Sequence, residues 1–518
     1  MTLNAPLPDA DVVIVGCGPS GMMAAVTLAE AGRSVIVLDM QPCPGGQIFR
    51  NLEANLCDAS PAGQSLLAAL GPAYRAGADL IRRFRAFSGA CSGIDYRPQT
   101  TVWEVRPDGT VGWLQGMNAG YVRGRQVLLA HGAMERPLPF PGWTLPGVMT
   151  AGAVQTLLKA GRLKPSGRVV LAGTGPLLLL LANQLHQLGV KPALMGRTDR
   201  FSDAVRAARH LRLGGVLPLV KGLGWLGRLK LAGVETVTGL ETLAAHGKDG
   251  VESVSFTVGG KRRTLPCDLL IVHDGIVPAI DIPNAAGLRL QWDGPNASWR
   301  PQTTVDGLGS SSLPPELYAG PCVLRVTGDA RKIGGAEAAM AHGVVAAQAI
   351  LAALDHGMGP SRAALRAVGK ALSVRPFLDA AFPPGLARAL PGDETIVCRC
   401  EELTAGDLRA KIRSGFRNMD ALRGETRCGM GPCQGRSCMV TAARLLEDET
   451  SAAGCPPTFR GRPPIRPIPL GAVARLSGLD PRATIRLTLE DKPENAPESG
   501  PESGPEHGAE DMVDAPAH

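Results

Sequence analysis

The chain has 518 residues, more than one hydrophobic core usually holds, so we expect two or three domains. Its 44% apolar and 19% charged content is that of a folded protein, and 65 glycines and 43 prolines without a collagen-like period indicate many tight turns. The net charge of +7 is uneven, because nine acidic residues and one lysine at 490–518 leave that tail near −8 and the rest near +15. Scattered basic residues and an aromatic content of 4% argue against nucleic-acid binding.

Neither a secretion signal nor a membrane span is expected. The first ten residues lack a basic region, and the first apolar run breaks at Gly16. The most apolar stretch, Val169–Gly189, contains too many glycine and polar residues for a lipid-facing helix, and a buried strand, turn and helix explain it better. We therefore expect a cytoplasmic protein without a transmembrane segment.

The first elements follow the order strand, glycine turn, helix, strand and acid. An apolar run at residues 11–15 leads into Gly-Cys-Gly-Pro-Ser-Gly, a helical stretch extends to residue 31, and a second apolar run at residues 34–38 ends at Asp39. This spacing predicts a dinucleotide-binding unit, although the motif alone does not distinguish FAD from NAD.

The residue types of this motif have physical reasons. Gly16 permits a tight turn, Gly18 lets the backbone approach a pyrophosphate, and Gly21 lets the helix lie close to the strand. The phosphates would meet free N–H groups at the helix N-terminus. Asp39 can accept hydrogen bonds from both ribose hydroxyls and would repel a 2′-phosphate. The predicted cofactor-binding residues here are Gly16, Gly18, Pro19, Ser20, Gly21, Asp39 and Met40.

Further along, helices and strands surround a second glycine turn. Residues 62–87 have a helical apolar pattern, residues 100–129 indicate antiparallel strands, and another strand, glycine turn and helix begins at Arg168. The later expected elements are strands at 192–195, 254–258, 267–272 and 323–326, a polar loop at 307–315 and a helix at 336–354. Two dinucleotide-type units are therefore predicted, with the second inserted into the first.

This order predicts an α/β fold of two Rossmann-like domains followed by a small helical domain. The first domain is expected in two stretches of chain, 1–150 and 281–390, on either side of the inserted unit at 151–280. The cysteine-rich domain (391–455), an extended Pro/Arg segment (456–489) and a disordered acidic tail (490–518) are expected to follow.

The second glycine motif departs from the usual pattern. It reads "GTGPLL", so Leu178 stands where the third glycine or an alanine is expected and adds bulk between helix and strand. The next strand runs into Arg197 and supplies no acid for a ribose. We favour a retained structural domain, while Arg197 leaves binding of NADP open.

Five of the 12 cysteines lie close together in the sequence. Cys398 and Cys400 form one pair of thiolates, Cys433 and Cys438 form another, and Cys428 is a fifth candidate. In a cytoplasmic chain this distribution favours a metal site over disulfides. Soft thiolates suit an iron–sulfur cluster or zinc, and spacing alone does not separate the two.

Two short segments carry a first resemblance. "GGQ" at 45–47 follows the second strand, and "TGDA" at 327–330 precedes a helix start. Together they resemble the two-dinucleotide-domain flavoprotein disulfide-reductase superfamily. The resemblance implies FAD in the first unit, an aspartate on its ribityl-phosphate part and a helix N-terminus facing the isoalloxazine. The further FAD residues it implies are Gly46, Gln47, Gly132, Gly328, Asp329, Gly335 and Ala336.

The match to this superfamily is partial. His131-Gly132-Ala133 stands where Ala-Thr-Gly is usual, so only a backbone crossover role is carried over to Gly132. No CxxC or CxxxxC pair lies near Gly45 or in the second unit, so disulfide-reductase chemistry is not expected.

The cysteine-rich stretch "VCRCEELTAGDLRAKIRSG…TRCGMGPCQGRSC" resembles the bacterioferritin-associated-ferredoxin-like [2Fe-2S] domain. The resemblance implies a [2Fe-2S] cluster on Cys398, Cys400, Cys433 and Cys438, with Cys428 as the alternative ligand. The final pair here is C-x₄-C, whereas members of that family typically have C-x-x-C.

Three segments together carry a more specific resemblance, which extends from about residue 10 to residue 475. "GAMERPLPFPGWTLPGVMTAGAVQTLLK", "GTGPLLLLLA" and "CGMGPCQGR" resemble the alpha subunits of heteromeric opine oxidases, D-hydroxyproline dehydrogenase and hydrogen cyanide synthase. That family implies a D-amino-acid-oxidase-like beta subunit that oxidises an opine or D-amino acid, FAD and the cluster in this chain, FMN between the subunits, and an electron acceptor that is not specified.

We find no acid–base constellation for substrate oxidation and predict no catalytic residue. His131, His273 and His342 are candidates only by residue type. Two alternatives stay open beside the electron-transfer subunit. One is a stand-alone NAD(P)H-dependent reductase, and the other is a non-enzymatic iron–sulfur binding or iron-release partner.

Overall fold

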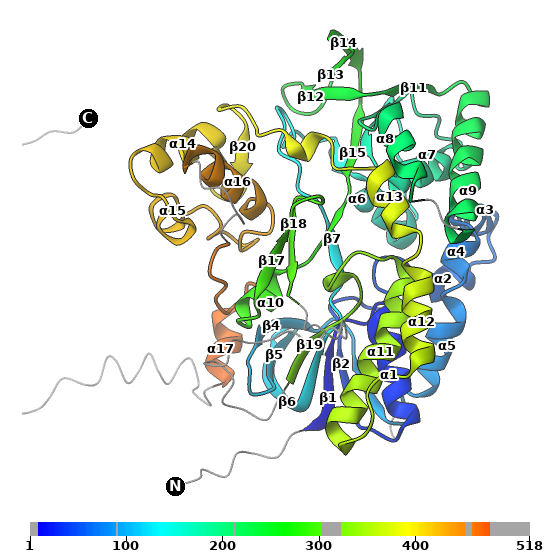
Figure 1. The fold of residues 1–518 in the computed structure, drawn as a ribbon, viewed down its shortest axis with the longest axis vertical. Helices are drawn as coiled ribbons and strands as arrows, with labels where there is room; N and C mark the ends of the chain where they lie inside the picture. The colour runs from blue at the N-terminus through cyan, green and yellow to red at the C-terminus, as the bar shows by residue number, and fades with distance from the viewer. Residues whose placement is uncertain (1–8, 90–91, 211–212, 303–322, 451–457, 477–518) are drawn as a thin grey trace, which may run out of the picture. The chain divides into compact units, whose positions relative to one another are not determined.

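The computed structural model describes residues 9–89, 92–210, 213–302, 323–450 and 458–476 (Figure 1). The chain forms two compact units that divide after Pro469. The described portion of the second unit is helix α17 (Leu470–Leu476). The predicted polar loop at 307–315 and the predicted disordered tail lie outside the described residues.

A parallel sheet forms the centre of the first nucleotide-binding half, which is the domain predicted above from residues 1–150 and 281–390. Its strands lie in the order β3-β2-β1-β6-β19, and Val13 of β1 pairs with Ile36 on one side and Val127 on the other. Near-continuous apolar strands of this kind are typical of sheets covered on both faces. The strands are β1 (Ala10–Val15), β2 (Val35–Leu38), β3 (Ile94–Arg97), β6 (Asn118–Leu129) and β19 (Val323–Val326).

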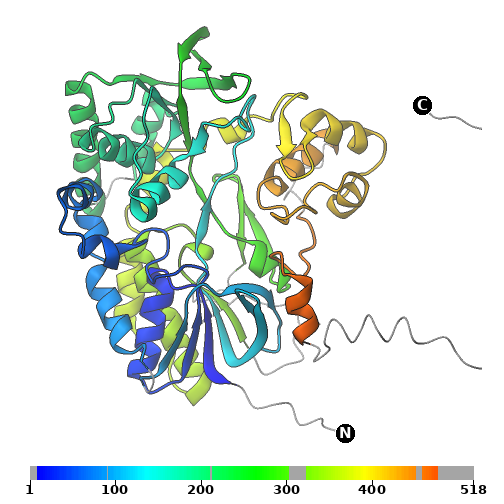
Figure 2. The same ribbon diagram turned by 180° about the vertical axis from the view of Figure 1, so that it is seen from behind.

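Helices cover one face of this sheet and antiparallel strands cover the other (Figures 1 and 2). Along β1, Ile14 packs towards the helices and Val13 packs towards the antiparallel strands. The helices on the first face are α1 (Pro19–Glu30) and α11 (Ala336–Asp355), with α5 (Ala78–Ala86) packed on α1. The other layer consists of β4 (Thr101–Val105), β5 (Thr110–Gln115) and the first half of β6.

Within the described portion of the chain, α11 is the one helix long and apolar enough to cross a membrane. Half of its most apolar window is buried in the fold. A Cβ atom on Gly343 would lie 2.4 Å from the backbone oxygen of Ser20, so α11 and α1 are in close backbone contact. This is the packing of a core helix.

The inserted nucleotide-binding half contains its own parallel sheet, in the order β11-β10-β9-β15-β8. The structure therefore confirms the predicted fold class of two Rossmann-like units. The sheet strands are β8 (Val148–Thr150), β9 (Val169–Thr174), β10 (Leu194–Arg197), β11 (Glu235–Thr238) and β15 (Leu269–Asp274). Around them lie α6 (Ala151–Thr156), the π-helical turn η1 (Leu157–Gly161), α7 (Pro176–Gln187), α8 (Phe201–Ala208), α9 (Leu213–Leu231), β12 (Leu240–His246), β13 (Ser253–Val258) and β14 (Lys261–Pro266).

The chain crosses between the two halves through the antiparallel pair β7 (Ala133–Glu135) and β16 (Ile276–Pro278). Arg136, directly after β7, is buried at the crossing. Its guanidinium donates hydrogen bonds to three backbone carbonyl oxygens, those of Asp274 (2.9 Å), Ala297 (2.8 Å) and Asn296 (2.6 Å). One side chain thus ties three segments together where the second half is inserted.

The helical pattern predicted over residues 62–87 is present, but it is interrupted twice. The structure has three short helices instead, α3 (Pro61–Leu70), α4 (Pro72–Arg75) and α5. Gly71 has φ +81° and precedes a proline, so it ends α3. A Cβ atom at Gly77 would lie 2.4 Å from the ring of Phe49, which explains a glycine at the second break.

A small helical domain follows the return of the chain to the first half. It contains β20 (Ile396–Cys398), β21 (Leu403–Thr404), α14 (Ala405–Arg413), α15 (Met419–Thr426) and α16 (Met439–Thr450). Its core includes Ile280 and Trp299 from the preceding half, and Phe459 from the segment that follows. Farther along that segment, the N–H of Ile465 donates to the carbonyl of Trp103 in β4 (2.9 Å). The cysteine-rich domain is therefore packed on the first half at several points.

Candidate cofactor sites

The first glycine turn leaves no room for side chains at Gly16 and Gly21. Gly16 has φ +101°, and a Cβ atom on it would lie 2.6 Å from the backbone oxygen of Ala130. A Cβ atom on Gly21 would lie 2.0 Å from the oxygen of Gly16, and one on Gly46 would lie 2.8 Å from the Cα of Gly18. No side chain caps the N-terminus of α1. The turn is thus a backbone cradle beside free N–H groups, which fits a pyrophosphate.

Asp39 directly follows β2 and is 7% exposed. Its Oδ1 accepts a hydrogen bond from the N–H of Gln41 (3.3 Å), and its Oδ2 has no partner among the described residues. Burial raises the pKa of this carboxyl to about 6. A buried carboxylate oxygen without a donor fits the ribose hydroxyls of a dinucleotide.

Replacing Asp39 with asparagine should stabilise the FAD-free protein and weaken FAD binding. The raised pKa means that the FAD-free fold favours the protonated carboxyl, so wild-type stability is fully present below pH 3.8 and falls as pH rises through about 6. At neutral pH this pKa shift lowers the free energy of unfolding of the FAD-free wild type by about 3 kcal/mol. The lost charged acceptor should weaken FAD binding on the order of 10- to 100-fold. Urea unfolding against pH would check the first effect, and equal pH profiles for the two proteins would contradict it.

The segment 327–330, which carries the second FAD-type pattern, packs against the first glycine turn. The hydroxyls of Thr327 and Ser20 lie 2.9 Å apart, and a Cβ atom on Gly328, whose φ is +64°, would lie 2.8 Å from the Cβ of Ser20. Asp329 Oδ1 accepts hydrogen bonds from the N–H groups of Gly334 (2.8 Å) and Gly335 (3.1 Å). These contacts place the N-terminus of α11, which begins at Ala336, on the same side of the sheet as the turn.

The remaining predicted FAD residues differ in their surroundings. Met40 is 55% exposed, whereas Gln47 accepts a hydrogen bond from Arg50 through its Oε1 (2.9 Å). Gly132 has φ +78° directly before β7, with no atom within 4 Å of its Cβ position. The N–H of Gly45 donates to the carbonyl of Cys17 (2.9 Å), so the loop that carries Gln47 is attached to the glycine turn.

Lys159 is a buried residue of this region that sequence reasoning missed. It lies in η1, and its Nζ donates to the carbonyl oxygens of Gln47 (3.2 Å) and Ile48 (3.1 Å) and to Gln155 Oε1 (3.1 Å). Burial lowers the pKa of this amine to about 8. A lysine in the otherwise apolar "AVQTLLKAG" pattern was the signal that could have identified it. Lys159 anchors the loop that contacts the glycine turn.

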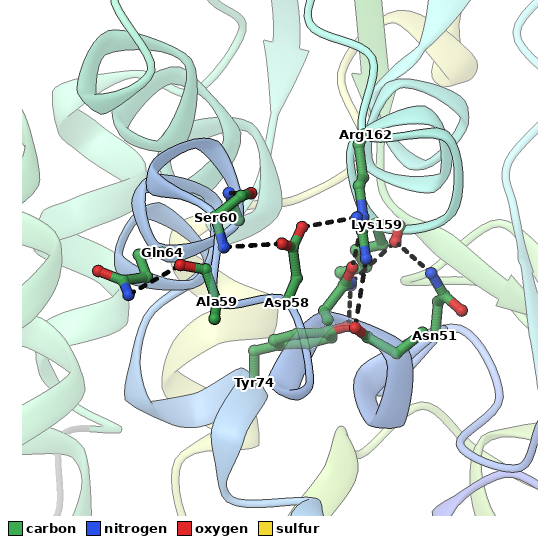
Figure 3. Close-up of polar contacts among 11 residues, drawn as sticks. Asn51, Asp58, Ala59, Ser60, Gln64, Tyr74, Lys159 and Arg162 are labelled. Atoms are coloured by element: carbon green, nitrogen blue, oxygen red, sulfur yellow. Dashed lines mark hydrogen bonds and ion pairs between the residues drawn. The ribbon is translucent and has the colours of Figure 1, made fainter.

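Figure 3 shows the polar network around this lysine. Asn51 donates from Nδ2 to the carbonyl of Lys159 (3.2 Å), and Asn55 does the same at 2.9 Å. The ammonium also lies 5.6 Å from the ring centroid of Tyr74. The network therefore holds residues 47–55 of the first half against the inserted half.

The second glycine turn is as closely packed on its neighbouring strand as the first, and Thr174, Gly175 and His273 line a cavity beside it. A Cβ atom on Gly173 would lie 1.7 Å from the backbone oxygen of His273. Leu178 is 1% exposed and belongs to the core between the two halves. Arg197 is engaged by Asp199, which accepts from its Nε at 3.1 Å and from its Nη2. The arginine that could meet a 2′-phosphate thus already has a carboxylate partner.

The three candidate histidines have structural partners. His131 Nε2 donates to the carbonyl of Ala279 (2.7 Å), and His273 Nδ1 lies 2.6 Å from Glu135 Oε1. His342 Nε2 lies 3.2 Å from Arg331, and burial lowers the pKa of this histidine to about 4. We assign none of them to catalysis.

The structure brings the five cysteines together in two groups. The Sγ atoms of Cys398, Cys428 and Cys438 lie within 4.8 Å of one another, and all three side chains are buried. Cys400 and Cys433 are hydrogen-bond partners and are more exposed. The neighbouring thiols of Cys428 and Cys438 lower the pKa of Cys398. Cysteine side chains that converge in this way fit an iron–sulfur cluster.

Comparisons with known families agree with both sites. Residues 10–308 match the family of pyridine nucleotide-disulphide oxidoreductases, and residues 396–448 match the BFD-like [2Fe-2S] binding domain. The fold also resembles that of L-proline dehydrogenase from P. horikoshii, with a TM-score of 0.62 at 18% identity over 90% of this chain and 79% of that one. The chain is an FAD- and [2Fe-2S]-containing oxidoreductase subunit.

Comparison with individual curated proteins identifies the family more specifically. The chain is 38% identical to the A subunit of opine oxidase from Rhizobium meliloti (strain 1021), over 90% of this chain and 98% of the relative. It is 37% identical to the A subunit of opine oxidase from Agrobacterium tumefaciens (strain Ach5), over 90% and 92%. It is 31% identical to the hydrogen cyanide synthase subunit HcnB of Pseudomonas aeruginosa, over 90% and 98%. The chain belongs to the family of opine oxidase A subunits.

Proposed function

We propose that this chain is the electron-transfer subunit of a heteromeric opine or D-amino acid dehydrogenase or oxidase. The observation that carries the proposal is one chain with a backbone cradle for a dinucleotide and a separate cysteine site, in which three thiols lie within 4.8 Å of one another and two more form a pair. FAD in the first site would accept two electrons and release them singly, which suits transfer to a cluster. Ile280 and Trp299 support such a pathway because they attach the cluster domain to the first half in one core.

The ligand assignment belongs to this proposal. The cysteines proposed to hold the cluster are Cys398, Cys400, Cys433 and Cys438. The residues proposed to hold FAD are Gly16, Gly18, Pro19, Ser20, Gly21, Asp39, Met40, Gly46, Gln47, Gly132, Gly328, Asp329, Gly335 and Ala336. The unpartnered oxygen of Asp39 and the glycine contacts described above support the FAD set.

A partner protein would oxidise the amine. The curated relatives are named as the A subunits of opine oxidases, which supports a complex with at least one further subunit. We propose a D-amino-acid-oxidase-like beta subunit, FMN at the interface and a cytoplasmic location. Leu178 in place of the third small residue of the motif, and the carboxylate partner of Arg197, disfavour the alternative of a stand-alone NAD(P)H-dependent reductase.

The test uses the full chain purified anaerobically, alone and together with a D-amino-acid-oxidase-like flavoprotein encoded beside it. NADH and NADPH should leave the flavin absorbance of the single chain unchanged. Opines or D-amino acids should bleach the flavin and reduce the cluster only when the partner is present, which absorbance and EPR spectra would follow. Bleaching by NAD(P)H alone, or zinc in place of iron, would overturn the proposal.

A further inference from the structure

The cysteine site is unequal on its two sides. On one side three buried thiols, those of Cys398, Cys428 and Cys438, have Sγ atoms within 4.8 Å of one another. On the other side Cys400 and Cys433 contact each other, and no third cysteine of the described residues joins that group. A [2Fe-2S] cluster takes four thiolates in all. One thiol on the three-thiol side is therefore in excess.

The positions of the three thiols make them interchangeable. Two thiolates on one tetrahedral metal ion lie about 3.8 Å apart, given metal–sulfur bonds of about 2.3 Å. The 4.8 Å limit on the three Sγ atoms is close to this, so any two of them reach a common ion by small side-chain movements. They come from different backbone segments, because Cys398 ends β20, Cys428 follows α15 and Cys438 precedes α16. Replacing one side chain therefore leaves the other two in position.

The surroundings of Cys428 accommodate a neutral thiol that binds no metal. Cys428 is fully buried in the core of the cluster domain, among residues such as Leu422 and Phe459. A neutral cysteine behaves as a small apolar side chain, so it does not need a metal to be buried. Its backbone is fixed by the hydrogen bond from its N–H to Thr426 Oγ1 (3.2 Å).

We propose that Cys428 is a reserve ligand, which replaces Cys438 on the three-thiol side when Cys438 is lost. Cys398 and Cys438 then hold one iron in the wild-type protein, and Cys400 and Cys433 hold the other. The inference rests on the ligand set of the proposed function. It adds that the two sides of the cluster differ in how they respond to the loss of a cysteine. Loss of Cys438 is tolerated, whereas loss of Cys433 is not.

Four alanine variants of the full chain test this asymmetry. Cys428→Ala should keep the wild-type iron and sulfide content. Cys438→Ala should keep most of its iron and sulfide, with changed EPR g-values because Cys428 takes over. Cys433→Ala and the double variant C428A/C438A should lose the cluster. Iron and sulfide per chain and the EPR spectrum of the reduced protein are the measurements. Unchanged flavin content shows that the first half of each variant is folded, and an unchanged circular dichroism spectrum shows that the helices of the cysteine-rich domain are retained.

The outcomes separate the inference from the proposed function. If the wild-type chain contained no iron, the proposed function itself would be contradicted. With an iron-containing wild type, equal loss of the cluster in Cys438→Ala and Cys433→Ala would overturn the reserve role. Loss of the cluster in Cys428→Ala would instead make Cys428 a standing ligand, and retention in the double variant would also contradict the inference.

Discussion

Replacing Gly21 with alanine is expected to remove FAD from the protein. The new Cβ atom would lie 2.0 Å from the backbone oxygen of Gly16, far inside contact distance, so α1 has to move away from the strand and turn. Overpacking of this kind costs about 1–3 kcal/mol of folding stability. The larger effect falls on the cofactor, because the shift displaces the N–H groups of the cradle that would meet the pyrophosphate. We expect FAD binding weaker by on the order of 100-fold.

Flavin absorbance per chain after gel filtration, together with thermal unfolding, measures this effect. The matched control is Gly369→Ala in helix α12 (Arg362–Ala371), where the glycine is exposed and nothing lies within 4 Å of its Cβ position. The control should keep its FAD and gain about 0.5–1 kcal/mol, because alanine favours a helix more than glycine does. A Gly21→Ala protein that retained its full flavin content would refute the cradle.

The first glycine turn could be predicted because its signals are local. Apolar runs, glycines and an acid at fixed spacing specify strand, turn, helix and strand without reference to the rest of the chain. The structure forms these elements at Ala10–Val15, Pro19–Glu30 and Val35–Leu38. The breaks at Gly71 and Gly77 were equally local, but the apolar period of residues 62–87 outweighed them in the prediction.

Long-range contacts could not be predicted from one sequence. The bonds of Lys159 to residues 47 and 48 span more than 100 positions, and no local pattern encodes such a pairing. Strand β6 pairs antiparallel with β5 in its first half and parallel with β1 in its second, which depends on tertiary packing. The cysteine spacing likewise left Cys428 and Cys438 as alternatives, and only the fold shows that both lie beside Cys398.

Replacing Arg136 with methionine is expected to lower the free energy of unfolding by about 3–5 kcal/mol. The side chain is 3% exposed, and its loss would leave three carbonyl oxygens without their donors, of which those of residues 274 and 297 are buried and that of residue 296 is partly buried. It would also remove the cation beside the buried carboxylate of Asp274, which accepts from the N–H groups of Gly385 and Ala387. The contacts between the two halves should therefore fail first. Denaturant unfolding followed by flavin fluorescence measures the loss.

Two further variants separate hydrogen-bond geometry from charge. Arg136→Lys keeps the positive charge, but one ammonium does not reproduce a planar fork directed at three carbonyls, so an intermediate loss is expected. Arg82→Met removes an arginine whose side chain is 78% exposed, and we expect a change within about 0.5 kcal/mol. If Arg136→Met were as stable as the wild type, the attachment of the inserted half would have to rest on the apolar core shared by the two halves. The strand pair β7 and β16 would then act only as a connection, without the clamp that the buried guanidinium provides.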